Sequence, residues 1–158
     1  MATDVHIKFD GIDGESTDRD HKGEVRVLTW GWGVAQAAVA AGAGSGTGKA
    51  TPADFVFTHE YDKASPLLAK RCAQGKHFAT VVLSARKAGE GQKDFLKVTM
   101  KEVFITSVQV AGQGDGAPQE SVSLRYGTIE FGYKPQDARG ALGAEVKFNW
   151  DLKSGKVT

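Results

Sequence analysis

Residues Thr58–Phe78, THEYDKASPLLAKRCAQGKHF, contain the only segment of this chain whose pattern clearly predicts a helix. Ser65 is a suitable N-cap, because its hydroxyl can accept a hydrogen bond from a backbone N–H that has no partner inside the helix. Pro66 suits the first helical position, where its missing N–H costs nothing. Gly75 can adopt the left-handed conformation that ends a helix. We therefore predict a short helix at about residues 66–74.

One side of this helix is apolar. Leu67, Leu68 and Cys72 are spaced to share a stripe, and we expect all three to face the core. So short a helix is marginal in isolation, so packing against a larger structure must hold it. Cys72 is the only cysteine, which excludes an internal disulfide, and we interpret it as a small buried hydrophobic residue rather than a nucleophile.

The rest of the chain is predicted to form strands and turns. Apolar and polar residues alternate at Val5–Phe9 and again at Val146–Leu152, as they do in half-buried strands. Elsewhere the alternation slips by one residue, after Val27, after Met100, after Ile105 and at Gly127. Such slips are typical of β-bulges, which supply the coiling that a barrel needs. The sequence therefore predicts a mainly β fold, a β-barrel of two sheets with bulged strands and one short α-helix.

Three tryptophans and one low-complexity segment complete the expected architecture. Trp30, Trp32 and Trp150 recur at strand spacing and are predicted core residues, because aromatic rings bury a large area. Residues 38–51 are rich in Gly and Ala, and we interpret them as a flexible extended surface loop. Because a strand pattern resumes at Asp54, this loop does not separate domains. We expect a single domain spanning residues 1–158.

Composition excludes several classes of partner. Twenty basic residues nearly balance 19 acidic ones, so no overall field favours nucleic acid or anionic membranes. No apolar run approaches the ~18 residues needed to span a bilayer. The N-terminal residues lack the apolar segment of a secretory signal peptide. We expect a protein made in the cytoplasm, without membrane insertion, that can leave the cell only by a route that reads no N-terminal signal.

Catalytic and cofactor motifs are missing from the sequence. The segment 42–50, GAGSGTGKA, departs from a phosphate-binding loop at Ala43 and Ala50. The four histidines have no spacing that would chelate a metal ion; they are His6, His21, His59 and His77. We therefore predict no catalytic residues, no cofactor and no metal.

Five short segments occur in an order that carries a family resemblance. They are Gly14–Ser16, Val27–Gly33, Phe57–His77 with its Asp62–Leu67 motif, Arg86–Gly89 and Tyr133–Gln136. Together with the Gly-rich loop after the tryptophan strand, they make the chain similar to the haemolysin-coregulated protein (Hcp) family of the type VI secretion system. The resemblance covers essentially the whole chain.

The resemblance implies a non-enzymatic structural protein. Hexameric rings would stack into a hollow tube that is carried inside a contractile sheath behind a tip spike and secreted by the type VI machinery. Effector proteins would be carried and protected in the ring lumen. The partners implied are further copies of this chain, effectors, and the spike and sheath proteins. Since the chain ends shortly after its last strand, we expect cargo to be carried non-covalently.

Site residues also follow from the resemblance. Gly31 would face the lumen, while its neighbours Trp30 and Trp32 would lie in the core. The extended loop would reach toward the neighbouring ring or subunit; its candidate contact residues are Gly42, Gly44, Gly46, Gly48 and Lys49.

Two other classes of function compete with the tube protein. A monomeric small-ligand-binding β-barrel would need an apolar internal cavity, which large residues such as Phe55, Phe57 and Trp150 are expected to fill. A hydrolase could draw a triad from Ser65, a histidine and an aspartate, but the chain has no Gly-x-Ser-x-Gly elbow to support it.

Overall fold

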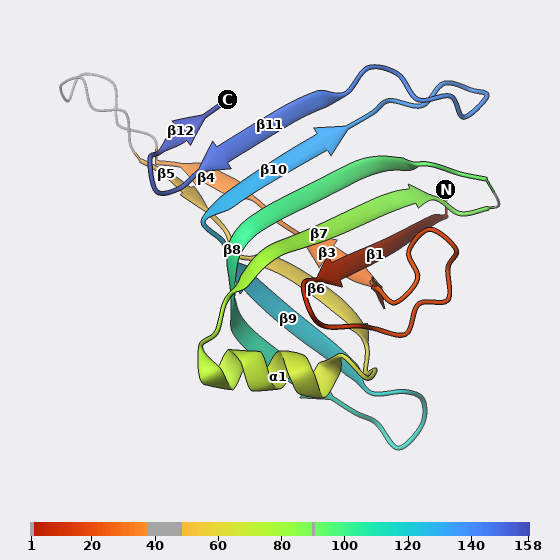
Figure 1. Cartoon of the computed structure of the whole chain (residues 1–158), viewed down its shortest axis with the longest axis vertical. Helices are drawn as coiled ribbons and strands as arrows, with labels where there is room; N and C mark the ends of the chain where they lie inside the picture. Colours follow the sequence, from red (N-terminus) through yellow and green to blue (C-terminus); the bar gives the residue numbers. More distant parts are fainter. Residues whose placement is uncertain (1, 38–48, 90) are drawn as a thin grey trace.

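A computed structural model describes residues 2–37, 49–89 and 91–158 (Figure 1). The helix is α1 (Ser65–Gln74). The strands are β1 (Thr3–Phe9), β2 (Val25–Arg26), β3 (Thr29–Gly31), β4 (Val34–Gln36), β5 (Ala50–Pro52), β6 (Phe55–Glu60), β7 (Phe78–Lys87), β8 (Asp94–Ala111), β9 (Gln119–Arg125), β10 (Thr128–Tyr133), β11 (Val146–Asp151) and β12 (Lys156–Val157).

The strands form two antiparallel sheets that share one strand. The first sheet has the order β12-β11-β10-β8-β7-β1-β2, and the second has the order β3-β6-β9-β8. β8 belongs to both, because its N-terminal half pairs with β7 and β10 and its C-terminal half with β9. The prediction of a mainly β, two-sheet fold with one short helix is confirmed. The barrel is not closed, since β12 and β3 each have one neighbour among the described residues.

The phase slip after Val27 marks a change of sheet, so the predicted bulge there is wrong. The backbone N–H of Val27 donates to Val5 O of the first sheet at 2.8 Å, and that of Leu28 donates to Thr58 O of the second sheet at 2.8 Å. A chain that crosses between two facing sheets must change parity to keep its apolar side chains between them. The slip therefore separates β2 from β3.

The slip at Gly127 has the same origin, because β9 lies in the second sheet and β10 in the first. The Gly127 N–H donates to the carbonyl oxygens of Lys101 and Glu102, at the point where β8 itself passes from one sheet to the other. A Cβ on Gly127 would lie 3.2 Å from the Glu102 Cβ and 2.8 Å from its Oε2, so a larger residue at this crossing would have to displace the Glu102 side chain. A true register shift occurs in the β8–β9 pairing after Ile105, which confirms the predicted second slip in that strand.

The helix ends as predicted but begins differently. Gly75 has a φ of 66°, and its N–H donates to carbonyls of the last turn. Ser65 is not the N-cap: Ala64 holds that position without a side-chain cap, and Ser65 is the first helical residue and buried. The Asp62 carboxylate instead accepts a hydrogen bond from Ala64 N–H at 2.9 Å, and Asp62 N–H donates to Ser65 Oγ at 3.0 Å. Asp62 therefore takes over the interaction expected of Ser65.

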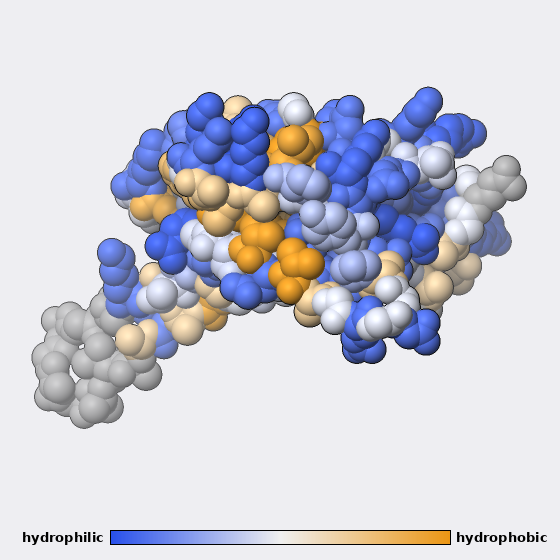
Figure 2. All heavy atoms as spheres, turned by 90° about the horizontal axis from the view of Figure 1, so that it is seen from below, coloured by the Kyte–Doolittle hydropathy of each residue, from blue (hydrophilic) through white to orange (hydrophobic). Residues whose placement is uncertain are grey.

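Only one of the two helix leucines reaches the core. Leu68 is fully buried and Cys72 packs at the core margin, whereas Leu67 is 43 % exposed, so its predicted burial is wrong. Adjacent helix positions point about 100° apart, and a narrow contact surface admits one of them. In Figure 1 α1 lies in front of the lower part of β8, the strand that it contacts. Seen from below, the surface is mostly hydrophilic, with a few apolar side chains gathered near its middle (Figure 2).

The three tryptophans have three different environments. Trp150 is buried, which confirms its prediction, and Trp32 is half-buried against the core. Trp30 is 36 % exposed, so its assignment to the core is wrong. Its ring stacks on Phe55 with centroids 5.8 Å apart, but β3 is an edge strand, so part of the ring stays exposed.

Among the described residues β4 and β5 pair only with each other; they form a small hairpin, here called the arm, outside the two main sheets. It lies at the end of the molecule where β11 meets β12 (Figure 1). Ala50 and Thr51, expected in the extended loop, belong to β5, while Lys49 is exposed beside it. The loop glycines predicted to contact a neighbouring ring or subunit lie outside the described residues; they are Gly42, Gly44, Gly46 and Gly48.

In the part of the chain that the structure describes, no helix is both long and apolar enough to cross a membrane.

We predict that Leu68→Ala destabilises the protein by about 2–5 kcal/mol, because it leaves a cavity under the helix. Leu67→Ala, next to it but exposed, should change the free energy of unfolding by no more than about 0.5 kcal/mol. Urea denaturation of both variants measures the difference. Equal losses would contradict the one-sided packing of α1.

Candidate functional site on the outer face of the second sheet

The outer face of the second sheet is defined by its strand register. Partners in adjacent strands share a face, so two rows of side chains point away from the core. The rows are Thr29, Thr58, Ser121 and Gln109, and next to it Gly31, Val56, Ser123 and Ser107. We call these eight residues the hydroxyl face.

The inner face of the same strands is apolar. Trp30 pairs with Phe57, Phe57 with Val122, and Val122 with Val108, and all of these side chains point toward the first sheet. The alternation along β3, β6 and β9 therefore separates a packed side from a solvated side. The polar residues of the hydroxyl face are placed outward by the burial of their neighbours.

Gly31 is the last residue of β3, the edge strand of the hydroxyl face. It is exposed, and a Cβ built on it would meet nothing within 4 Å. Beside it the Thr29 and Thr58 hydroxyls lie 2.6 Å apart and hydrogen-bond to each other across the strands. The rows carry small, uncharged groups that can donate and accept hydrogen bonds, so they suit contact with a polypeptide more than recognition of one small ligand.

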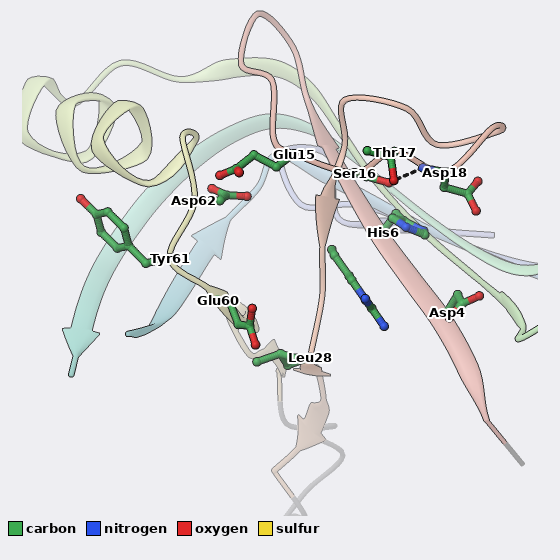
Figure 3. A pocket seen from close by; sticks show the side chains of 11 residues that line it. Asp4, His6, Glu15, Ser16, Thr17, Asp18, Leu28, Glu60, Tyr61 and Asp62 are labelled. Atoms are coloured by element: carbon green, nitrogen blue, oxygen red, sulfur yellow. Dashed lines mark hydrogen bonds between the residues drawn. The ribbon is translucent and has the colours of Figure 1, made fainter. Parts of the chain in front are cut away.

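A pocket of about 580 Å³ opens beside the edge formed by β2 and β3 (Figure 3). Leu28 and Tyr61 contribute exposed apolar surface to its lining. Figure 3 shows Glu15, Glu60 and Asp62 on one side of it and Asp4 and His6 on the other. Carboxylates dominate the lining, with Arg26 as the only lysine or arginine among the described lining residues.

His6 is the buried member of this pocket. Burial, reinforced by the nearby His21 and Arg86, lowers the pKa of the His6 imidazole to about 4. Its ring stacks on His21 with centroids 4.9 Å apart, which joins β1 to the segment 11–24.

His21 fastens that segment to the outer face of the first sheet. Its Nδ1 lies 2.9 Å from a Glu24 carboxylate oxygen and its Nε2 lies 3.0 Å from an Asp94 carboxylate oxygen. Burial opposes protonation of His21, but the two carboxylates outweigh it and raise the pKa of the imidazole. Arg86 adds ion pairs to Asp18 and Asp20 of the same segment.

A second histidine lies inside the fold. His59 and Glu120 are both fully buried, and His59 Nε2 lies 2.9 Å from Glu120 Oε1. They are register partners on β6 and β9, so this pair links two strands through the core. Because neither side chain reaches the surface, its role is structural. Within the described ranges, no three His, Cys, Asp or Glu residues come close enough together to hold a metal ion.

The structure keeps most of the sequence-predicted residues apart. Gly31 is exposed on the hydroxyl face, and Lys49 lies at the arm. Sequence reasoning missed Thr58, Ser121 and Ser123 as part of one surface. Alternation along each strand identifies them as outward-facing, but only the pairing of β6 with β9 places them beside Gly31.

Comparison with known proteins places this geometry in a family. The family model described as "Type VI secretion system effector, Hcp" matches residues 6–133. Protein hcp1 of Pseudomonas aeruginosa is 46 % identical over 157 residues, which cover 97 % of each protein. This chain belongs to the Hcp family. The resemblance inferred from the ordered sequence segments is thereby confirmed.

Solved structures extend the match to the whole Hcp fold. Hcp1 from Salmonella typhimurium is 36 % identical, with complete coverage of both chains and a TM-score of 0.83. A structure described as that of a type six secretion system protein is 32 % identical, covers 99 % of this chain and 100 % of its own, and has a TM-score of 0.92. β11 and β12, beyond the family-model match, are therefore part of the shared Hcp fold.

We predict that His6→Gln weakens the acid sensitivity of this Hcp-family protein. Since the folded pKa of His6 is lowered from 6.5 to about 4, its contribution to stability is present above pH 6.5 and is lost as pH falls from 6.5 to 4. His21 acts with the opposite sign, because its raised pKa adds stability below pH 6.5. Unfolding free energies measured across this window should fall less steeply in His6→Gln than in wild type.

Lys8→Gln, an exposed substitution on the same strand, is the matched control and should keep the wild-type slope. If the unfolding free energy of His6→Gln fell with pH as steeply as that of the control, the acid sensitivity could not be assigned to His6.

Proposed function

We propose that this chain is a structural tube component of the type VI secretion system. Copies form hexameric rings, the rings stack into a hollow tube, and the tube is carried within a contractile sheath behind a tip spike. The lumen holds and protects effector proteins, and the machinery secretes the tube without an N-terminal signal. The role is structural rather than enzymatic.

The hydroxyl face is the observation that carries this proposal. Its two rows carry small, uncharged side chains across a four-stranded sheet, flanked on the same face by Glu60 and Arg125, and Gly31 is open to solvent at its edge. A lumen wall has to hold different polypeptides and release them, so deep pockets and strong charges would be unfavourable there. Hydroxyl groups can exchange hydrogen bonds with water and cargo at little net cost. We therefore assign the hydroxyl face to the lumen.

Exposed apolar side chains near both edges of the same sheet support ring closure. Leu28 and Trp30 lie at the β3 edge, and Phe104 and Val110 lie on β8 at the other. In a closed ring each copy uses two different surfaces, one toward each neighbour, and no strand edge stays open. Burial of these four side chains between copies would cover both the exposed apolar surface and the open strand edges.

The competing ligand-binding barrel would need space between the sheets. Large side chains occupy that region, and each has at most 1 % of its surface exposed; they include Phe9, Phe55, Phe57, Phe78 and Leu83. The largest pocket described above opens at the surface, is lined by carboxylates, and so does not suit an apolar ligand.

We predict that the purified protein has a solution mass of about six copies. With 16.8 kDa per chain this is roughly 100 kDa, measurable by light scattering, and negative-stain images of the same peak should show a ring with a central hole. A stable monomer at high concentration would contradict the tube function and favour the ligand-binding barrel.

We predict that Gly31→Arg leaves rings intact but changes which effectors they retain. The new side chain has room, and it adds a charge to an otherwise uncharged face. Ring mass and co-purification of effectors measure the two properties. Asn149→Arg adds the same charge to an exposed position of the first sheet and should retain cargo as wild type does. Loss of rings in Gly31→Arg would place this residue at a subunit contact instead of the lumen.

A further inference from the structure

Tyr126 joins two distant parts of the chain through its hydroxyl. The residue lies between β9 and β10 and is 4 % exposed. Its Oη accepts a hydrogen bond from Trp32 Nε1 at 2.5 Å and donates one to the carbonyl oxygen of Ala53 at 2.7 Å. Both the donor and an acceptor position of the phenol are therefore in use.

Those two partners are the roots of the arm formed by β4 and β5. Trp32 precedes β4 by two residues and Ala53 directly follows β5. Ala53 N–H also donates to Gly33 O at 2.8 Å, which closes the base of the hairpin. Tyr126 is thus hydrogen-bonded to the incoming and the outgoing segment at once.

The Trp32 root is held firmly against the first sheet. Its indole packs on Phe131 of β10 with ring centroids 4.9 Å apart and on Phe148 of β11 at 6.0 Å. The Ala53 root borders a surface pocket of about 470 Å³, lined by Thr51, Pro52, Tyr126 and Leu152 among others. The hydrogen bond from the Tyr126 hydroxyl to Ala53 O connects the Ala53 root to the Trp32 root, which packs on the first sheet.

Beyond its roots the arm has little support. Val34 is 52 % exposed, and in the described residues the arm strands pair with each other alone. Its direction relative to the body is therefore decided where it is attached. Burial raises the pKa of the Tyr126 phenol, so the proton donated to Ala53 is retained well into the alkaline range.

We propose that the Tyr126 hydroxyl is a clamp that fixes the direction in which the arm leaves the body and so presents the arm to an adjacent copy of this chain. The clamp itself is a property of one chain. Presentation to another copy rests on the proposed tube function, in which rings of this chain stack on one another. Tyr126 acts through Trp32 and Ala53 and is a positioning residue.

Tyr126→Phe tests the clamp, because it removes the hydroxyl and keeps the ring. Tyr133→Phe is the matched control: this tyrosine is 47 % exposed, and no hydrogen bond of its hydroxyl is found in the described part. Amide hydrogen exchange is measured in both variants for the arm residues 34–36, 50 and 51, and for the buried strands β7 and β8.

In Tyr126→Phe the arm amides should exchange roughly five- to tenfold faster than in the control, as expected for the loss of one or two hydrogen bonds at the root. Faster exchange of the β7 and β8 amides would report global destabilisation. The increase in exchange rate at the arm amides must be larger than any increase at β7 and β8. Equal arm exchange in the two variants would overturn the clamp.

Assembly separates the two halves of the proposal. Tyr126→Phe should form rings of wild-type mass but shorter stacks in electron micrographs than Tyr133→Phe. Faster arm exchange with unchanged stacks would overturn presentation to an adjacent copy while supporting the clamp. If wild type forms no rings, the tube function fails, and the exchange comparison still decides the clamp on the single chain.

Discussion

β8 pairs with strands of both sheets, and the arrangement of the other strands depends on how its backbone passes from one to the other. Its first half pairs with β7 and β10 and its second half with β9. The transfer occurs near Glu102, the one non-glycine residue with a positive φ in the described ranges. Gly127 lies against it, and a Cβ there would come within 3.2 Å of the Glu102 Cβ. Backbone hydrogen bonds from Gly127 to Lys101 and Glu102 hold the crossing together.

The same crossing determines where the surface residues end up. Because β9 and β10 part at Tyr126 and Gly127, one face of β9 joins the hydroxyl face while β10 covers the inner aromatic residues with β11. Tyr126 lies at this point and can reach both roots of the arm. The core crossing, one edge of the proposed lumen wall and the roots of the arm therefore meet at a few adjacent residues.

The two outer faces of the molecule differ in charge because they are covered differently. On the first sheet, His21 of the segment 11–24 contacts Asp94 of β8, and Arg86 of β7 contacts Asp18 and Asp20 of the segment. The charged groups there therefore neutralise one another. On the second sheet the hydroxyl face stays open and uncharged in its two rows. This asymmetry suits a wall with one side packed by its own chain and the other turned to changing polypeptide cargo, as the proposed function requires.

The sequence by itself determined the period of each strand, the helix and its glycine end, and the family. The first two depend on residues close together in the chain, and the family was recognised from the order of several short motifs along it. It also located each phase slip, but not its meaning: at Val27 and Gly127 a change of sheet produces the same one-residue shift as a bulge. Burial of Trp30 and Leu67 was mispredicted, since periodicity identifies a face but cannot show that a strand is at an edge or that a helix contact is narrow. Only the tertiary structure brought Thr58, Ser121 and Gly31 into one surface and joined Tyr126 to Trp32 and Ala53, because strand pairing between residues far apart in the chain decides which side chains meet.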